Sequence, residues 1–308
     1  MIAATALPRV DSDLCWEYEN PVPCGVVVGV DGSRESVAAL NSAAAFARRR
    51  RCPLHAVTVL SPFPASNAMS SATGPGGDVN TLRMDIRDSE LRHIVNVLEP
   101  ANDWTHEVVC GRPAPELTRI AEHRAADLLV IGRRQHAMMD RVLGGETVLQ
   151  VMRMSAIPVL AVDFDLEIAR TVVAAVDFSP SSILAARSVL RLMNGSGALY
   201  LVFVEPPPVL VQQGFAPPKQ AGLPVDLVSD FRRLIADLGE HGSIHIETVV
   251  LNGRPASAVV QFAERVGADL ITTGSHGHGR LERFLLGSVS TGIVRNANCA
   301  VLVVPPPK

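Results

Sequence analysis

Lysine is almost absent from this chain of 308 residues. Of its 28 cationic side chains, only Lys219 and Lys308 are lysines, and the others are arginines. A P-loop is excluded, because its G-x-x-x-x-G-K-S/T motif requires a lysine and occurs nowhere in the sequence. Long apolar runs are missing too: none approaches the ~18 residues of a membrane span, and residues 1–20 lack a signal-peptide core. The net charge of −3 gives no basic footprint for nucleic acid. We therefore expect neither a membrane nor a nucleic-acid partner.

Common enzyme and metal motifs are also missing. The five cysteines are scattered without a C-x-x-C pair, so neither a disulfide framework nor a zinc site is indicated, and a reducing, cytoplasmic location is expected. The sequence contains no G-x-S-x-G nucleophile elbow. No dinucleotide fingerprint of the form G-x-G-x-x-G follows the first strand of either half of the chain. These absences argue against nucleophilic catalysis and against dinucleotide binding.

What the chain does contain is an internal repeat. The tetrapeptide Gly-Arg-Pro-Ala occurs at 111–114 and again at 253–256, an offset of 142 residues, and Val-Asp at 30–31 recurs at 176–177, an offset of 146. Such a near-constant offset predicts two tandem copies of one fold. We expect a poorly structured N-terminal arm at 1–22, a first domain at 23–163 and a second domain at 170–305.

Buried strands alternate with amphipathic helices in both halves. The strands expected in the first half lie at 24–30, 54–60, 105–110, 127–131 and 158–162. Those of the second half lie at 171–176, 199–204, 244–251, 268–273 and 300–304. Alternation of this kind is typical of a doubly wound α/β fold, in which helices cover both faces of an open parallel sheet. Proline-rich stretches at 61–78 and 205–224 are predicted to be loops.

A glycine-rich stretch in the second half has the composition of a phosphate site. Gly274 and Gly277 follow an apolar strand, and both can take φ > 0 and leave room for a ligand to reach backbone N–H groups. Gly287 and Ser288 follow at the start of a predicted helix, where a partial positive charge favours phosphate. The alternative is a glycine-rich turn with Ser288 as the N-cap, and glycine spacing alone does not decide between the two.

Polar residues near this stretch have two interpretations each. Asp177 ends the first strand of the second half, where a carboxylate can accept hydrogen bonds from a ribose or base; Asp31 has the same place in the first half. Either could instead be a turn residue that bonds its own backbone. His276 and His278 form an H-x-H pair, but a loop lacks fixed geometry and no third ligand is evident, so we expect polar contacts near a phosphate rather than a metal.

These residues together resemble a known family, the tandem universal stress proteins. The family's ATP-binding pattern, G-x2-G-x9-G-S/T, is matched by Gly274, Gly277, Gly287 and Ser288, and the likeness extends over residues 24–305. It implies a five-stranded α/β fold in each half with strand order 3-2-1-4-5, pairing of the halves through their last strands, and a homodimer.

The resemblance also implies which residues bind ATP, either alone or with Mg²⁺. Asp177 would contact adenosine, and the phosphates and ribose would contact residues of the glycine stretch and the following helix. The residues concerned are Gly274, Ser275, His276, Gly277, His278, Gly279, Arg280, Gly287, Ser288 and Val289. In the first half the corresponding positions include Gly29, Asp31, Gly132 and Gly145.

The first half departs from the family pattern at two positions. Gln135 replaces the second glycine and Glu146 replaces the serine. A carboxylate at ~4 Å from a phosphate costs up to about 4 kcal/mol at an effective dielectric of ~20, roughly a thousandfold in affinity. Positive charge from Arg133, Arg134 and His136 could compensate for Glu146. We predict one competent nucleotide site, in the second half.

Three functions follow as hypotheses. The leading one is a cytoplasmic ATP-binding regulatory protein of the stress response, without a positioned general base and with at most slow hydrolysis through Arg280 and the histidines. The second is a scaffold of the same fold that acts through its proline-rich loops without nucleotide. The third, an adenylating enzyme, lacks a recognisable pyrophosphate motif near Asp177 and ranks lowest.

Overall fold

The computed structural model describes residues 25–61, 79–98, 104–133, 145–205, 227–277 and 286–307. The first half comprises β1 (Gly25–Gly29), α1 (Arg34–Arg50), β2 (Leu54–Leu60), α2 (Val79–Leu98), β3 (Thr105–Cys110), α3 (Pro113–His123), β4 (Ala126–Gly132), α4 (Gly145–Met154) and β5 (Val159–Val162). The second half comprises β6 (Thr171–Ala175), α5 (Pro180–Met193), β7 (Ser196–Glu205), α7 (Leu227–Leu238), β8 (Ser243–Asn252), α8 (Pro255–Val266), β9 (Leu270–Gly274), α9 (Ser288–Asn296) and β10 (Ala300–Val304).

Serine caps determine where the first helix of each half begins. Ser33 precedes α1 and Ser179 precedes α5, and each side-chain Oγ accepts a hydrogen bond from the N–H three residues later, at Ser36 (3.1 Å) and Ser182 (3.3 Å). These bonds satisfy N–H groups that have no partner within the helix. Pro180 occupies the first turn of α5, where its missing N–H removes no helical hydrogen bond.

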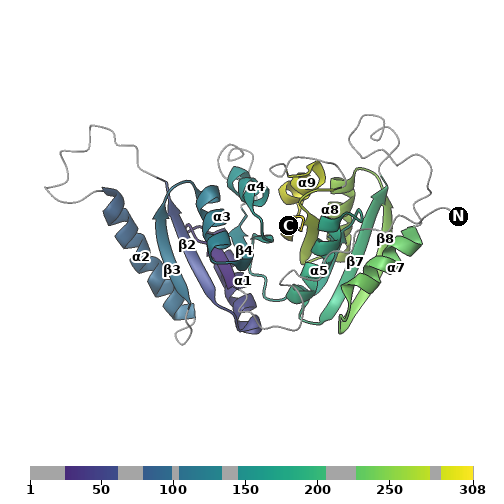
Figure 1. The fold of residues 1–308 in the computed structure, drawn as a ribbon, viewed down its shortest axis with the longest axis horizontal. Coiled ribbons are helices and arrows are strands. Elements are labelled where there is room, and N and C mark those ends of the chain that lie inside the picture. The colour runs from purple at the N-terminus through teal and green to yellow at the C-terminus, as the bar shows by residue number, and fades with distance from the viewer. Residues whose placement is uncertain are drawn as a thin grey trace.

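The strands form one sheet in the order β3-β2-β1-β4-β5-β10-β9-β6-β7-β8. Each half therefore has the strand order 3-2-1-4-5, and paired strands within a half are parallel. β5 and β10 are antiparallel, with Leu160 opposite Leu302, so the sheet continues from one half into the other (Figure 1). The strand order and the pairing through the last strands are both confirmed.

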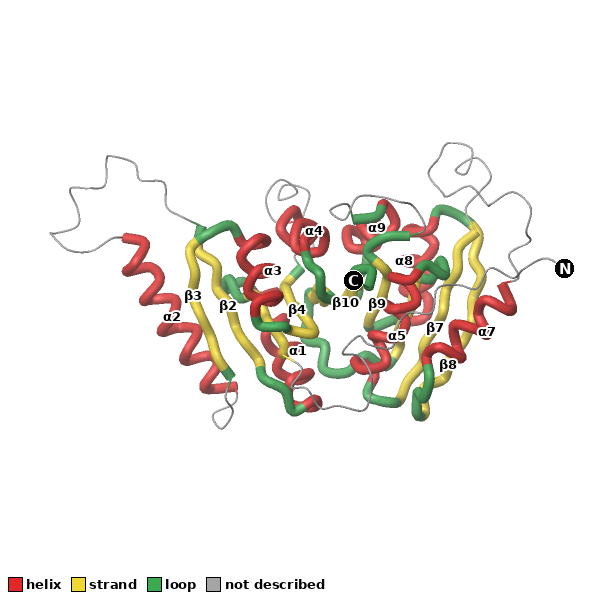
Figure 2. Tube along the Cα trace, viewed as in Figure 1, coloured by secondary structure: helices red, strands yellow, loops and turns green. Residues whose placement is uncertain are grey.

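Helices cover both faces of this sheet (Figure 2). Residues of α1, α2, α5 and α7 belong to one core cluster, and residues of α3, α4, α8 and α9 belong to a second. Successive strand residues point to opposite faces, so Val26 and Val28 join the first cluster and Val27 joins the second. Each cluster includes residues of both halves, so the two halves share their apolar layers.

Two strands of the second half are longer than the apolar runs predict. β7 and β8 pair in parallel from Ser196 opposite Ser243 to Glu205 opposite Asn252. The additional residues at both ends are polar, glycine or the small Ala198. Backbone pairing therefore continues where the side chains no longer need to be buried, which an apolar run cannot indicate.

Several predicted segments lie outside the described residues. They are the arm at 1–22, residues 62–78 of the first proline-rich stretch and residues 206–224 of the second. Among the described residues, no helix combines the length and apolar character needed to cross a membrane.

Replacing Leu302 by alanine should destabilise both halves together. Leu302 is 1% exposed, and the substitution leaves a cavity where β10 pairs with β5. A buried Leu→Ala change costs about 2–5 kcal/mol, and we expect the denaturant midpoint of one common transition to fall. Val250→Ala, at a position 46% exposed, is the control and should change the free energy of unfolding by less than about 0.5 kcal/mol. A separate transition affecting only the second half would contradict the prediction.

Candidate functional site

Two of the predicted site residues meet where β6 and β9 end. The two strands are parallel neighbours, so the residues that follow them lie at the same edge of the sheet, where ligands bind in open α/β folds. A Cβ added at Gly277 would lie only 2.5 Å from Asp177 Oδ2. The structure therefore brings the carboxylate of Asp177 directly against the glycine stretch.

Asp177 is oriented by its own turn. Its Oδ1 accepts a hydrogen bond from the N–H of Ser179 at 3.0 Å, and its own N–H donates to Ser182 Oγ at 3.3 Å. Asp31 makes the corresponding bond to the N–H of Ser33 at 2.9 Å. The turn interpretation is thus correct for both residues. The second oxygen of Asp177, Oδ2, faces Gly277.

Phe178 supports this turn and is not among the site residues predicted from the sequence. Its φ of 62° lies in the left-handed region, where the first half has Gly32 with a φ of 83°. That conformation costs a bulky residue about 1–2 kcal/mol. The ring centroid lies 5.6 Å from that of Phe203 and 5.2 Å from that of Phe231, and each aromatic pair contributes about 0.5–1.5 kcal/mol. Aromatic packing therefore offsets the strain and anchors the turn.

Gly274 is required for close packing. Its φ and that of Gly277 lie outside the left-handed region, so neither glycine uses the φ > 0 that its lack of a side chain allows. A Cβ added at Gly274 would lie 2.6 Å from Ser181 Oγ, and one added at Gly132 would lie 2.6 Å from the carbonyl carbon of Glu35. In both halves the glycine lets the strand end directly against the first turn of the helix that follows the Asp.

Hydrogen bonds hold the glycine stretch between α5 and α9. The carbonyl of His276 accepts hydrogen bonds from Ser181 Oγ and, at 3.5 Å, from Ser179 Oγ. The carbonyl of Ser275 accepts one from the N–H of Gly287 at 2.8 Å. Residues on both sides of the undescribed segment 278–285 are therefore bonded to each other, which places Gly287 beside Ser275.

The imidazole of His276 has one nitrogen without a protein partner. Nδ1 lies 2.8 Å from Ser275 Oγ, whereas Nε2 is buried and has no hydrogen-bond partner within the described part of the chain. A buried polar atom left unsatisfied costs about 1–3 kcal/mol, so a polar ligand atom at this position would be stabilising. In the described ranges no group of three His, Cys, Asp or Glu residues could hold a metal ion.

The N-terminus of α9 lies beside the same stretch. Gly287 is the N-cap and offers no side-chain cap, and Ser288 is the first helical residue. The alternative in which Ser288 is the N-cap is therefore wrong. Ser290 Oγ donates to the carbonyl of Gly274 at 2.7 Å, which ties the first turn of α9 to the end of β9. A helix start without a side-chain cap favours an anionic ligand through its N–H groups and its dipole.

Some of the predicted residues cannot be placed. Those outside the described residues are His278, Gly279 and Arg280 in the second half and Arg134, Gln135 and His136 in the first. Val289 is partly buried against the second core cluster, and Gly145 is the first residue of α4.

The first half keeps the scaffold but uses one position differently. Gly29 packs closely, because an added Cβ would lie 3.1 Å from Leu117 Cδ1. Arg133 stands where the second half has Ser275, and its guanidinium bonds to Asp163 and to three backbone carbonyls of the second half. The expectation that Arg133 supplies charge to a phosphate site in the first half is therefore wrong.

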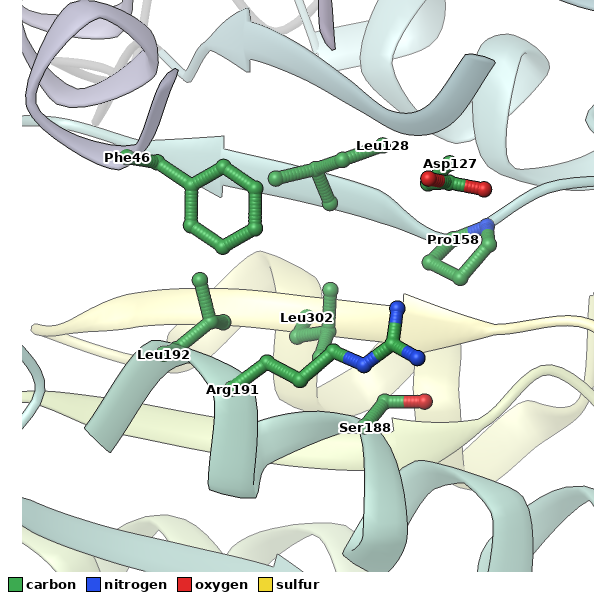
Figure 3. A pocket seen from close by; sticks show the side chains of 8 residues that line it. All are labelled: Phe46, Asp127, Leu128, Pro158, Ser188, Arg191, Leu192 and Leu302. Atoms are coloured by element: carbon green, nitrogen blue, oxygen red, sulfur yellow. The ribbon is translucent and has the colours of Figure 1, made fainter. Parts of the chain in front are cut away.

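A small cavity between the halves lies away from this site. It is lined by Phe46, Asp127, Leu128, Pro158, Ser188, Arg191, Leu192 and Leu302 (Figure 3). Asp127 and Pro158 place it near the starts of β4 and β5, opposite to the strand ends that carry Asp31 and Gly132. Its volume of ≈ 20 Å³ is enough for about one water molecule, so it cannot hold a nucleotide.

Relatives of this chain in two organisms are universal stress proteins. A universal stress protein of Mycolicibacterium smegmatis is 26% identical over 300 residues, which cover 92% of this chain and 97% of that protein. A universal stress protein of Methanocaldococcus jannaschii is 46% identical over 74 residues, 24% of this chain and 44% of that protein.

A solved universal stress protein has a fold similar to that of this chain. The crystal structure from Archaeoglobus fulgidus has a TM-score of 0.67 at 19% identity, covering 92% of this chain and 97% of that chain. The model of the universal stress protein family matches residues 25–163 and again residues 169–305. Because these two matches span most of its length, the chain belongs to the universal stress protein family.

Proposed function

We propose that this protein binds ATP in its second half and acts as a nucleotide-dependent regulator of the stress response. The observation that carries the proposal is the placement of Asp177 Oδ2 against Gly277, beside the start of α9, where the N-cap residue Gly287 has no side chain to cap the helix. The carboxylate offers an acceptor for one end of a nucleotide, and the helix offers N–H donors and a positive dipole for the other.

Adenosine and phosphate would contact different elements. Asp177 would accept hydrogen bonds from the ribose hydroxyls or the base, because it lies at the end of β6. The phosphates would lie at the first turn of α9, where Ser288 and Val289 provide N–H groups and Ser288 a hydroxyl. Gly274, Gly277 and Gly287 would leave space for their approach, and Ser275, His276, His278, Gly279 and Arg280 would complete the same stretch. Mg²⁺ could accompany ATP and would neutralise phosphate charge.

Binding is favoured over rapid hydrolysis by the chemistry of the chain. Neither Lys219 nor Lys308 belongs to either glycine stretch, so no lysine is placed there to stabilise a transferring phosphoryl group. Any hydrolysis would depend on Arg280 and the histidines and would be slow. The cytoplasmic location and the homodimer that the family resemblance implies are part of the same proposal.

Substitution of Gly277 by alanine should weaken ATP binding. The added Cβ would lie 2.5 Å from Asp177 Oδ2, while the N–H of Ser179 holds the other oxygen, so the turn or the glycine stretch must move. Loss of one charge-assisted hydrogen bond, worth about 1.5–3 kcal/mol, raises Kd about 10–100-fold, as calorimetric titration would measure. Gly25→Ala, whose Cβ would lie 3.8 Å from Ala126 Cα, should bind as wild type. An unchanged Kd for Gly277→Ala would place the site elsewhere.

The wild-type chain should bind a single ATP with high affinity. In the first half Gln135 and Glu146 replace the glycine and the serine of the pattern, and Arg133 is bonded to the second half. Titration of nucleotide-free protein should therefore give one site, and two equivalent sites would contradict this. The double variant Gln135→Gly, Glu146→Ser should add a second ATP-binding event, weaker than the first, because it removes up to about 4 kcal/mol of repulsion in the first half.

The nucleotide carried by the protein as purified separates the proposal from a scaffold function. Denaturation should release ATP, whereas a chain that never holds nucleotide would be consistent with the scaffold. A universal stress protein solved in complex with cAMP has a TM-score of 0.34 to this chain, which is too low to transfer its ligand. Titrations with ATP, ADP and cAMP would establish the preference directly.

A further inference from the structure

Arg133 reaches from the first half of the chain into the second. It directly follows β4, and its guanidinium donates to the carbonyls of Val294 (2.8 Å), Ala297 (2.9 Å) and Cys299 (2.8 Å). These carbonyls belong to the last turn of α9 and the residues that follow it. The same guanidinium pairs with Asp163 through Nε at 3.1 Å and Nη2 at 2.5 Å. Arg133 is only 5% exposed, so all of these bonds are shielded from water.

This contact breaks the symmetry between the halves. The residue equivalent to Arg133 is Ser275, and its hydroxyl stays within its own half, 2.8 Å from His276 Nδ1. Ile157 is the residue equivalent to Cys299. Its carbonyl accepts a hydrogen bond from Ser155 Oγ at 2.7 Å and not from an arginine of the other half. The carbonyl of Ile157 is therefore satisfied within the first half, whereas that of Cys299 is bonded across the junction by an arginine.

The bonds made by Arg133 constrain the whole of α9. A cation at the C-terminal end of a helix complements its dipole and satisfies carbonyls that have no helical partner. α9 contains 9 residues, so it is about 14 Å long. Its opposite end is tied to β9 through Ser290 and Gly274. Because α9 is so short, a displacement of its C-terminal end also moves the N–H groups at its N-terminal end.

We propose that Arg133 is a positioning residue, which holds α9 from the first half and thereby sets the affinity of the second half for phosphate. The inference rests on the proposed ATP binding, because it concerns the phosphate end of that site. It assigns a role to the first half that does not require nucleotide there. Arg133 acts at a distance, since it touches the C-terminal end of α9 and the phosphates would lie at the N-terminal end.

The test compares ATP with adenosine in Arg133→Met and Arg133→Lys. Adenosine would contact the turn at Asp177 but not the start of α9, so damage confined to the position of α9 should weaken ATP alone. Couplings between sites are typically about 5–150-fold; we expect Arg133→Met to raise the Kd of ATP about tenfold and that of adenosine less than about twofold. Arg133→Lys keeps a charge for Asp163 but cannot bond three carbonyls at once, and should lie between.

Arg119→Met is the matched control. Arg119 has a side chain 60% exposed and pairs with Glu116 on the same helix, so its loss should leave both affinities unchanged. Calorimetry is carried out at a temperature where circular dichroism shows every variant folded. Equal weakening of ATP and adenosine in Arg133→Met, or no weakening of either, would overturn the positioning role.

Hydrogen exchange decides the matter without nucleotide. In Arg133→Met the amides of residues 288–296 should exchange at least about tenfold faster than in wild type, because the opening free energy of α9 falls, while those of α4 keep their rates. Unchanged exchange in α9 would overturn the inference. If wild type binds no ATP, the proposed function fails, and exchange in α9 still decides whether Arg133 holds the helix.

Discussion

The antiparallel pairing of β5 with β10 determines how the rest of the molecule is arranged. Residues 159–161 pair with residues 301–303, and this short ladder makes one sheet from two parallel ones. Because side chains alternate between faces, the pairing also aligns the helical layers, so that α4 and α9 lie in the same layer and contact each other. Without this alignment, the residue after β4 could not reach the end of α9.

Within each half, a second constraint places the end of the fourth strand, β4 or β9, against the first helix, α1 or α5. Gly132 and Gly274 both end their strands where a Cβ would collide with that helix. The scaffold of the site therefore follows from packing that a folded half needs in any case. The residues that follow these glycines differ between the halves, because Arg133 bonds across the junction and Ser275 bonds within its own half.

The sequence predicts most of the fold because its apolar runs have the length of strands and recur in the same order in both halves. The family resemblance implies that Asp177 meets the glycine stretch, because its strand order makes the first and fourth strands of a half neighbours that end at one edge of the sheet. The sequence does not predict why Gly274 is a glycine, because that depends on the distance to Ser181 rather than on local conformation. The partners of Arg133 are equally hidden, since Val294 is 161 residues away. Phe178 could have been noticed as the one change between Asp-Gly-Ser and Asp-Phe-Ser.

On the proposed function, the position of Arg133 links weak nucleotide binding in the first half to support of the site in the second half. A guanidinium that is bonded to Asp163 and to the end of α9 is engaged there and is not available to neutralise a phosphate in the first half. Ser275 is too short to make the reciprocal contact, and its hydroxyl instead lies against His276 in the stretch where phosphate would bind. This difference between equivalent positions adds to those at Gln135 and Glu146. On the proposed function, the first half contributes to nucleotide binding through the helix it holds and not through a nucleotide of its own.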